Sequence, residues 1–112
     1  MSIHTIVSAK ELDQHLAQHP VVLVDFWAPW CGPCKAMNPV LEQAALELPL
    51  SIVKINIDDA QELAGQYAIS SIPYLVLFVN GKRVDEKVGG QSFSSLQAWV
   101  TKYASPETPT QG

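Results

Sequence analysis

The two cysteines of this 112-residue chain, Cys31 and Cys34, stand three residues apart. Thiols at this spacing in the first turn of a helix can close a small disulfide ring and open it again to a dithiol. The apolar run 21–27, typical of a buried strand, ends just before them. A disulfide that closes so short a loop adds little stability by chain entropy. The pair therefore indicates thiol–disulfide redox chemistry rather than a structural cross-link.

The positions of the two cysteines predict different roles for them. Attack on a disulfide requires a thiolate, and unpaired backbone N–H groups at a helix start stabilise that anion at Cys31. Pro33 suits the first helical turn, because it lacks an N–H that would have no partner there. Cys34 lies one turn further in and is expected to be less accessible. We predict that Cys31 attacks the substrate disulfide and that Cys34 resolves the mixed disulfide.

Asp25 interrupts the apolar strand and is expected to be buried, on the same face as Leu23 and Trp27. Burial raises the pKa of a carboxyl group towards the range useful for proton transfer. One interpretation is an acid paired with a core lysine; the other is a general base that accepts the proton of Cys34, directly or through a water. The nearby cysteine pair favours the base. Lys54 is a candidate charge partner, although a strand lysine that extends towards solvent is an equal alternative.

The hydrophobic pattern predicts strands that alternate with helices. The sequence indicates a helix that begins at Ser8, with Glu11 completing a capping box, and that Pro20 stops. A similar box, Asp59 with Glu62, predicts the start of a short helix. The predicted strands span 3–7, 21–27, 51–57, 74–79 and 83–88, and the remaining helices span 31–48 with a kink at Pro39, 59–67 and 92–103. This order predicts an α/β fold with a central mixed sheet, helices on both faces and an antiparallel hairpin at one edge.

Composition sets limits on the class of protein. Apolar residues make up 47% of the chain, enough for one well-filled core, and the net charge of −4 comes without any basic cluster that could bind nucleic acid. The N-terminus resembles no signal peptide, and no apolar run is long enough for a membrane span. We expect one domain over residues 1–104, a disordered tail over 105–112, and a monomeric protein of the reducing cytoplasm.

Several stretches together resemble the thioredoxin family, and the similarity covers nearly the whole chain except the tail. The first, the run 24–35 with its Trp-Cys-Gly-Pro-Cys-Lys motif, is highly specific. The others follow in the same order as in the family, at nearly the same spacings. They are Pro39, Lys54–Asp58, Ile72-Pro73, Phe78, Asn80-Gly81 and Val88-Gly89.

The resemblance implies a thioredoxin fold and a specific activity. Thioredoxin reductase would reload the dithiol with electrons from NADPH, and the dithiol would reduce disulfides in client proteins without any bound cofactor. Gly32 and Pro33 match the pair that reducing members have between their cysteines. Asp25 and Lys54 match the family's buried acid and its lysine neighbour.

The resemblance also implies a client-docking surface beside the cysteines. The family's shallow apolar surface corresponds here to Trp30, Ile57, Ile72 and Gly89. It further implies that Pro73 follows a cis peptide bond and faces the cysteine pair, whereas composition alone favours the trans form. Tyr74, Pro29 and Ser71 depart from the family pattern, and the stretch between Pro39 and Lys54 is somewhat short. These departures leave client preference and the choice of reductase open.

Three alternatives stay open beside this interpretation. His15 and His19 could complete a Cys₂His₂ zinc set with the cysteines, but the ligand order is inverted relative to a zinc finger, so surface histidines are preferred and no metal is expected. A thiol oxidase or isomerase of the same fold is the second alternative. The third is a binding or stabilising subunit whose thiols take no part in its role.

Overall fold

The computed structural model describes residues 3–104, which form five strands and five helices. The predicted tail lies outside the described residues. No helix among those described is long and apolar enough to cross a membrane. In chain order the elements are β1 (Ile3–Thr5), α1 (Ala9–Gln18), β2 (Val21–Trp27), α2 (Gly32–Ala36), α3 (Asn38–Glu47), β3 (Ser51–Asn56), α4 (Gln61–Gln66), β4 (Tyr74–Val79), β5 (Lys82–Val88) and α5 (Phe93–Ala104).

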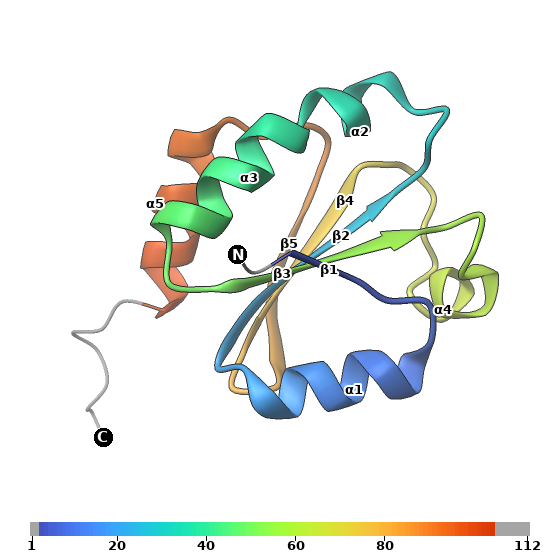
Figure 1. Ribbon diagram of the computed structural model, residues 1–112, viewed down its shortest axis with the longest axis horizontal. Coiled ribbons are helices and arrows are strands. Elements are labelled where there is room, and N and C mark those ends of the chain that lie inside the picture. The colour runs from blue at the N-terminus through green and yellow to red at the C-terminus, as the bar shows by residue number, and fades with distance from the viewer. Residues whose placement is uncertain (1–2, 105–112) are drawn as a thin grey trace.

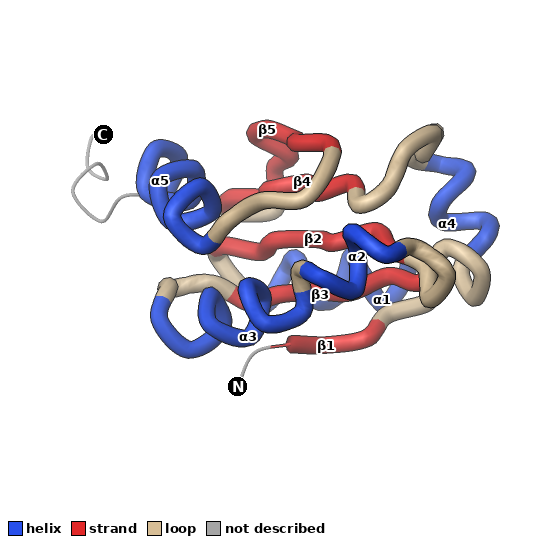
Figure 2. Tube along the Cα trace, turned by 90° about the horizontal axis from the view of Figure 1, so that it is seen from above, coloured by secondary structure: helices blue, strands red, loops and turns tan. Residues whose placement is uncertain are grey.

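The strands form one mixed sheet in the order β1-β3-β2-β4-β5 (Figure 2). β1 and β2 pair parallel to β3, whereas β4 pairs antiparallel to β2 and β5 to β4. Figure 1 shows α2, α3 and α5 on one face of the sheet and α1 on the other. The predicted α/β fold, with its edge hairpin and helices on both faces, is therefore confirmed.

Side chains of the central strands alternate between two cores, as they must when both faces of a sheet are covered. On the α1 face, Val22, Val24 and Phe26 of β2 pack in one cluster. Leu23 packs on the other face, against Met37 and Leu41 near α3. Asp25 and Trp27 follow Leu23 at alternate positions, so they lie on the face covered by α2 and α3.

A helix cap and a hairpin turn form as the local sequence predicts. The Ser8 side chain accepts a hydrogen bond from the Glu11 N–H at 3.2 Å and caps α1. The Glu11 carboxylate accepts from the Val7 N–H, one residue earlier than a capping box requires. In the β4–β5 hairpin, Asn80 and Gly81 have φ values of +53° and +80°, as a tight two-residue turn demands. This hairpin fixes the pairing of β4 with β5.

The prediction of one kinked helix over 31–48 was wrong in detail, because the chain forms two helices divided at Met37. Pro39 has no N–H, so it cannot bond to the carbonyl of Lys35. The Met37 N–H bonds to Cys34 at the end of α2, and Met37 then accepts from Leu41 at the start of α3. The break places α2 as a separate short helix beside the cysteines.

The predicted capping box at Asp59 and Glu62 was also wrong. α4 begins later, with Ala60 at its N-cap and no side-chain cap. The N–H groups of Asp59 and Ala60 both bond to the carbonyl of Asn56, which closes a turn after β3. This turn uses the residues that the box would have required, and it buries Ala60 in the core.

Candidate active site

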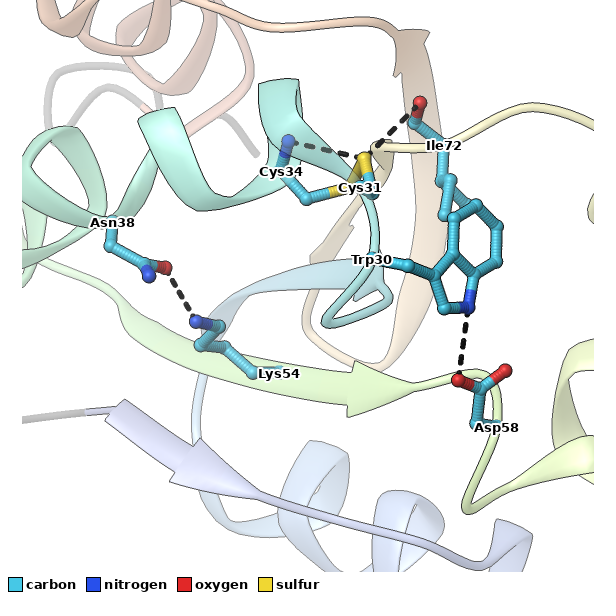
Figure 3. The surroundings of a disulfide bond; sticks show 7 residues. All are labelled: Trp30, Cys31, Cys34, Asn38, Lys54, Asp58 and Ile72. Carbon is cyan, nitrogen blue, oxygen red and sulfur yellow. Dashed lines mark hydrogen bonds between the residues drawn. A yellow bond between two sulfur atoms is a disulfide. The ribbon is translucent and has the colours of Figure 1, made fainter.

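Cys31 and Cys34 form a disulfide at the junction between β2 and the helices (Figure 3). Their Cα atoms are 5.3 Å apart, a separation normal for a disulfide. Cys31 is the N-cap of α2, and its Sγ accepts a hydrogen bond from the Cys34 N–H at 3.2 Å. An N–H directed at the sulfur stabilises negative charge there, which favours a thiolate at Cys31 once the bond is reduced.

The two sulfur-bearing residues differ in accessibility. Cys31 is 6% exposed and Cys34 only 1%. Between them, Gly32 and Pro33 are exposed, and Pro33 occupies the first turn of α2, as predicted. A substrate from solvent therefore reaches Cys31 before Cys34.

The loop before β4 comes close to the disulfide. The Ile72–Pro73 peptide bond is cis, so the composition-based expectation of a trans bond was wrong and the one implied by the resemblance is confirmed. The carbonyl oxygen of Ile72 lies 3.9 Å from Cys31 Sγ (Figure 3). The Pro73 carbonyl accepts from the Gly89 N–H at 2.8 Å, and Gly89 has a φ of +95°, a conformation that favours glycine. These contacts bring segments far apart in sequence to one edge of the cysteine pair.

Apolar side chains from separate segments surround the disulfide. Ile57 and Ile72, both partly buried, pack with Trp27 against the two cysteines. Trp30 is 67% exposed, and its indole N–H donates to the Asp58 carboxylate at 3.0 Å (Figure 3). The sequence motif included Asp58, but nothing in the sequence indicated its contact with Trp30. Of the four predicted docking residues, Ile57 and Ile72 therefore contact the cysteines and Trp30 is exposed beside them. Gly89 bonds to Pro73 in the neighbouring loop.

Asp25 is fully buried, and neither of its carboxylate oxygens has a hydrogen-bond partner. Burial raises its pKa to about 7, and the charge of Lys54 lowers the pKa by a smaller amount. A carboxyl group with this pKa can take up and release a proton near neutral pH. It lies under the α2–α3 segment, the same segment that bears Cys34.

Lys54 stands directly opposite Asp25 in the β2–β3 register. Its ammonium donates to the Asn38 side chain at 2.6 Å (Figure 3). It also lies 4.5 Å from the centre of the Trp27 ring. It forms no hydrogen bond with Asp25, so its influence on the carboxyl group is through space. Asn38 was missed by sequence analysis, since an asparagine that starts a helix after a break has no distinctive pattern.

Tyr74, which departs from the family pattern, faces away from the cysteines. Its ring packs with Phe26 in the core on the α1 side, at a centroid separation of 6.1 Å. Its hydroxyl donates to Glu86 and accepts from Arg83, and Arg83 and Glu86 also form an ion pair. Tyr74 therefore affects the packing of β4 and β5 and does not line the cysteine site.

The zinc alternative is contradicted by the structure. The two cysteines are bonded to each other, and His15 and His19 lie beyond the other end of β2. The strand is seven residues long, and a strand of that length spans about 23 Å. No four-ligand site can include both pairs.

Comparison with known proteins agrees with this geometry. The thioredoxin family model matches residues 3–102. The chain belongs to the thioredoxin family. Among its relatives, a thioredoxin from Porphyra purpurea is 43% identical over 107 residues, which cover 94% of this chain and all of the relative. A thioredoxin from Chlamydia trachomatis is 49% identical over 99 residues, covering 88% and 96% of the two chains.

Solved structures of thioredoxins have the same fold. A variant thioredoxin from Halobacterium salinarum superposes with a TM-score of 0.87 at 37% identity, covering 91% of this chain and 90% of the other. Thioredoxin from Schistosoma mansoni gives a TM-score of 0.83 at 30% identity, covering 92% and 99%. With a Cys-x-x-Cys pair at disulfide distance, this thioredoxin-family protein is a thiol–disulfide oxidoreductase.

Proposed function

We propose that this oxidoreductase reduces disulfides in client proteins and that thioredoxin reductase reloads it with electrons from NADPH. The observation that supports disulfide exchange most directly is the cysteine pair itself, in which Cys31 is the more exposed residue and its sulfur accepts the Cys34 N–H bond. Gly32 and Pro33 between the cysteines match the reducing members of the family. The dithiol itself holds the two electrons, so no bound cofactor is required.

In the first step the Cys31 thiolate attacks one sulfur of a client disulfide. A bond forms between Cys31 Sγ and that sulfur, the client disulfide breaks, and the second client sulfur leaves as a thiolate that takes a proton from water. Only Cys31 has the exposure for this attack. The Cys34 N–H directed at Cys31 Sγ supports the negative charge of the attacking thiolate.

In the second step Cys34 attacks Cys31 Sγ, closes the internal disulfide and releases the first client sulfur as a thiolate. Cys34 must first lose its proton, and its burial opposes ionisation. Asp25 is our proposed acceptor for this proton, directly or through a water, because its pKa of about 7 suits the transfer and its oxygens have no other partner. The charge of Lys54 lowers the pKa of this carboxyl group. Asp25 then passes the proton on to the released client thiolate, so across the two steps the client gains two electrons and two protons, one of the protons from water.

We propose that the client chain docks on the apolar edge formed by Trp30, Ile57, Ile72 and Gly89. Ile57 and Ile72 already contact the cysteines, so a chain lying on them would bring its disulfide to Cys31. The Ile72 carbonyl oxygen lies 3.9 Å from Cys31 Sγ, at the same edge. We further propose that the protein acts as a monomer in the cytoplasm, a compartment in which protein thiols are kept reduced.

A trapping experiment tests the order of the two thiols. Cys34→Ser should accumulate a covalent complex with a disulfide-bearing client, because the first step is intact and the second is blocked. Cys31→Ser is the matched control and should trap nothing. With thioredoxin reductase and NADPH present, neither variant should turn over. Trapping by Cys31→Ser instead would reverse the assigned roles, and turnover by either variant would exclude the two-thiol mechanism.

The equilibrium redox potential tests the direction of the reaction. The potential should lie near the value of about −270 mV known for thioredoxin, so that in a buffer poised at that potential about half of the pair is oxidised. A value near −180 mV or above, typical of protein disulfide isomerase, would reject the reductase and favour the oxidase or isomerase alternative. A stabilising subunit would bind its partner with unchanged affinity after both cysteines are replaced by serine.

A further inference from the structure

One side chain contacts both ends of the segment that carries Ile72. This segment, residues 68–73, joins α4 to β4, with Tyr67 directly before it as the C-cap of α4 and Tyr74 directly after it as the first residue of β4. The guanidinium of Arg83, on β5, lies 5.5 Å from the centre of the Tyr67 ring. The same guanidinium donates a hydrogen bond to the Tyr74 hydroxyl. Arg83 therefore bridges the two ends of the segment, which we call the docking loop.

Other contacts hold the Arg83 side chain in this place. It forms an ion pair with Glu86 on the same strand, and the Tyr74 hydroxyl donates to the same carboxylate at 3.0 Å. The Tyr67 and Tyr74 rings both pack near the Phe26 ring, at centroid separations of 5.1 and 6.1 Å. A guanidinium suits this position because its planar fork donates several hydrogen bonds while its face lies on an aromatic ring. Arg83, the only arginine of the chain, therefore makes a set of contacts that a lysine could not reproduce.

The docking loop has little internal structure of its own. Among the described residues, the N–H groups of residues 70–72 bond to no other backbone group. Ala68 has a φ of +52°, in the left-handed region that residues with a Cβ rarely adopt. The loop is tied near its ends, where the Ile69 N–H bonds back to α4 and the Gly89 N–H bonds to the Pro73 carbonyl. Its position therefore depends on what holds the two ends.

The position of the docking loop matters because Ile72 lies against the redox pair. The Ile72 side chain packs with the cysteines, and its carbonyl oxygen lies 3.9 Å from Cys31 Sγ (Figure 3). Tyr67 and Tyr74 pack against the core on the α1 side of the sheet. Arg83 thus holds the loop from the face away from α2, without touching either cysteine.

We propose that Arg83 is a positioning residue for client docking, which holds Tyr67 and Tyr74 together and so keeps Ile72 where a client chain reaches Cys31. This inference rests on the proposed function, because it concerns the surface proposed there for the client. A surface that is already ordered loses less conformational freedom when it binds. Removal of Arg83 should therefore weaken the reaction with a protein client and leave the chemistry of the cysteine pair unchanged.

Single-turnover reduction of two different disulfides tests this role. The protein is reduced beforehand and mixed either with insulin, a protein that contains disulfides, or with hydroxyethyl disulfide, which is too small to need a docking surface. The fluorescence of Trp27, which packs against the pair, follows the reaction. In Arg83→Ala the rate constant for insulin should fall roughly threefold to tenfold, the range expected when a few residues of a binding surface lose their order. The rate constant for hydroxyethyl disulfide and the redox potential should keep their wild-type values, whereas damage to the cysteine pair would change both rate constants.

Two further variants separate the position of the side chain from its charge. Lys82→Ala removes one positive charge from the neighbouring exposed position of β5 and should leave both rate constants unchanged. Arg83→Lys keeps the charge but cannot lie on Tyr67 and donate to Tyr74 at the same time, so it should lose most of what Arg83→Ala loses. The proposal would be overturned if Arg83→Ala reduced insulin as fast as the wild type. An equal loss in Lys82→Ala would also overturn it, because the effect would then come from charge alone.

Hydrogen exchange distinguishes failure of this inference from failure of the proposed function. The Ile69 and Gly89 N–H groups bond near the two ends of the docking loop, and in Arg83→Ala they should exchange at least about threefold faster. If the wild type reduces hydroxyethyl disulfide but not insulin, the proposed function fails, and the exchange rates then decide whether Arg83 holds the loop. Unchanged exchange at both amides would overturn its positioning role.

Discussion

Successive residues of β2 face two different environments. Val24 and Phe26 point to the α1 side, where they pack in a cluster of apolar side chains. Asp25, between them, points to the α2 and α3 side, where it is equally buried but has no hydrogen-bond partner. The side chains on the α1 face of β2 stabilise the fold, whereas the buried Asp25 carboxyl on the other face lowers its stability.

The difference shows that stability alone does not account for this strand. A buried polar group without a partner costs about 1–3 kcal/mol, and an ionised one costs more. A valine at position 25 would match its neighbours and avoid that cost. The proposed role of Asp25 as proton acceptor for Cys34 accounts for this cost. The two faces should therefore respond in opposite ways to substitution.

The largest effect is expected on the apolar face. Phe26→Ala removes a fully buried ring that packs near Tyr67, with a centroid separation of 5.1 Å. Loss of a buried phenylalanine lowers the free energy of unfolding by about 3–5 kcal/mol. Guanidinium unfolding curves measure this change. The redox potential of the folded variant should stay near the wild-type value, and a large shift would show that the two faces are coupled.

On the polar face, Asp25→Asn should raise stability, and the gain should depend on pH. The pKa of Asp25 is about 7 in the folded protein, above its ordinary value of 3.8. The folded state therefore keeps a proton that the unfolded state loses, and stability falls as pH rises from about 4 to 7. The slope is about 1.4 kcal/mol per pH unit at its steepest. At pH 8 the variant should be more stable by roughly 2–4 kcal/mol.

Urea unfolding of the wild type and of Asp25→Asn at pH 5, 6, 7 and 8 measures this effect. The quantity to compare is the difference between their free energies of unfolding, because groups common to both proteins cancel in it. The difference should grow with pH and level off above about pH 7, where Asp25 is ionised in both states. Resolution of the mixed disulfide should slow in the variant. A difference independent of pH would show that Asp25 does not titrate in this range.

Much of this contrast could be predicted from sequence. The unbroken apolar strand around Asp25 indicated a sheet covered on both faces and a buried carboxyl group, because polar residues in such a strand have no route to solvent. The Cys-x-x-Cys pair indicated the chemistry. These features depend on local pattern, which a single sequence contains.

The parts that sequence analysis missed depend on tertiary contacts. The division of one predicted helix at Met37 follows from how the chain packs around Pro39, and the late start of α4 follows from a turn closed by Asn56. The bond between Lys54 and Asn38 joins β3 to the start of α3, a pairing with no signature in sequence. The cis bond before Pro73 followed from family resemblance and not from composition.

Lys54→Met tests how the charge of Lys54 affects Asp25 on the polar face. The positive charge of Lys54 lowers the pKa of Asp25, in opposition to burial. Its removal should raise that pKa further, by about one unit. The pH at which the stability difference levels off should move upward accordingly. Lys10→Met, at an exposed position of α1, is the matched control and should leave the midpoint unchanged.

The smallest effect is expected for Asn38→Ala. The amide accepts from the Lys54 ammonium, and the loss of one such bond costs about 1 kcal/mol. Lys54 is then free to turn towards Asp25, whose oxygens lack partners. A closer ammonium would lower the pKa of Asp25, opposite in direction to Lys54→Met. Carboxyl ¹³C NMR titration measures the shift directly. If the pKa stays unchanged, Asn38 stabilises α3 but does not hold Lys54 away from the acid.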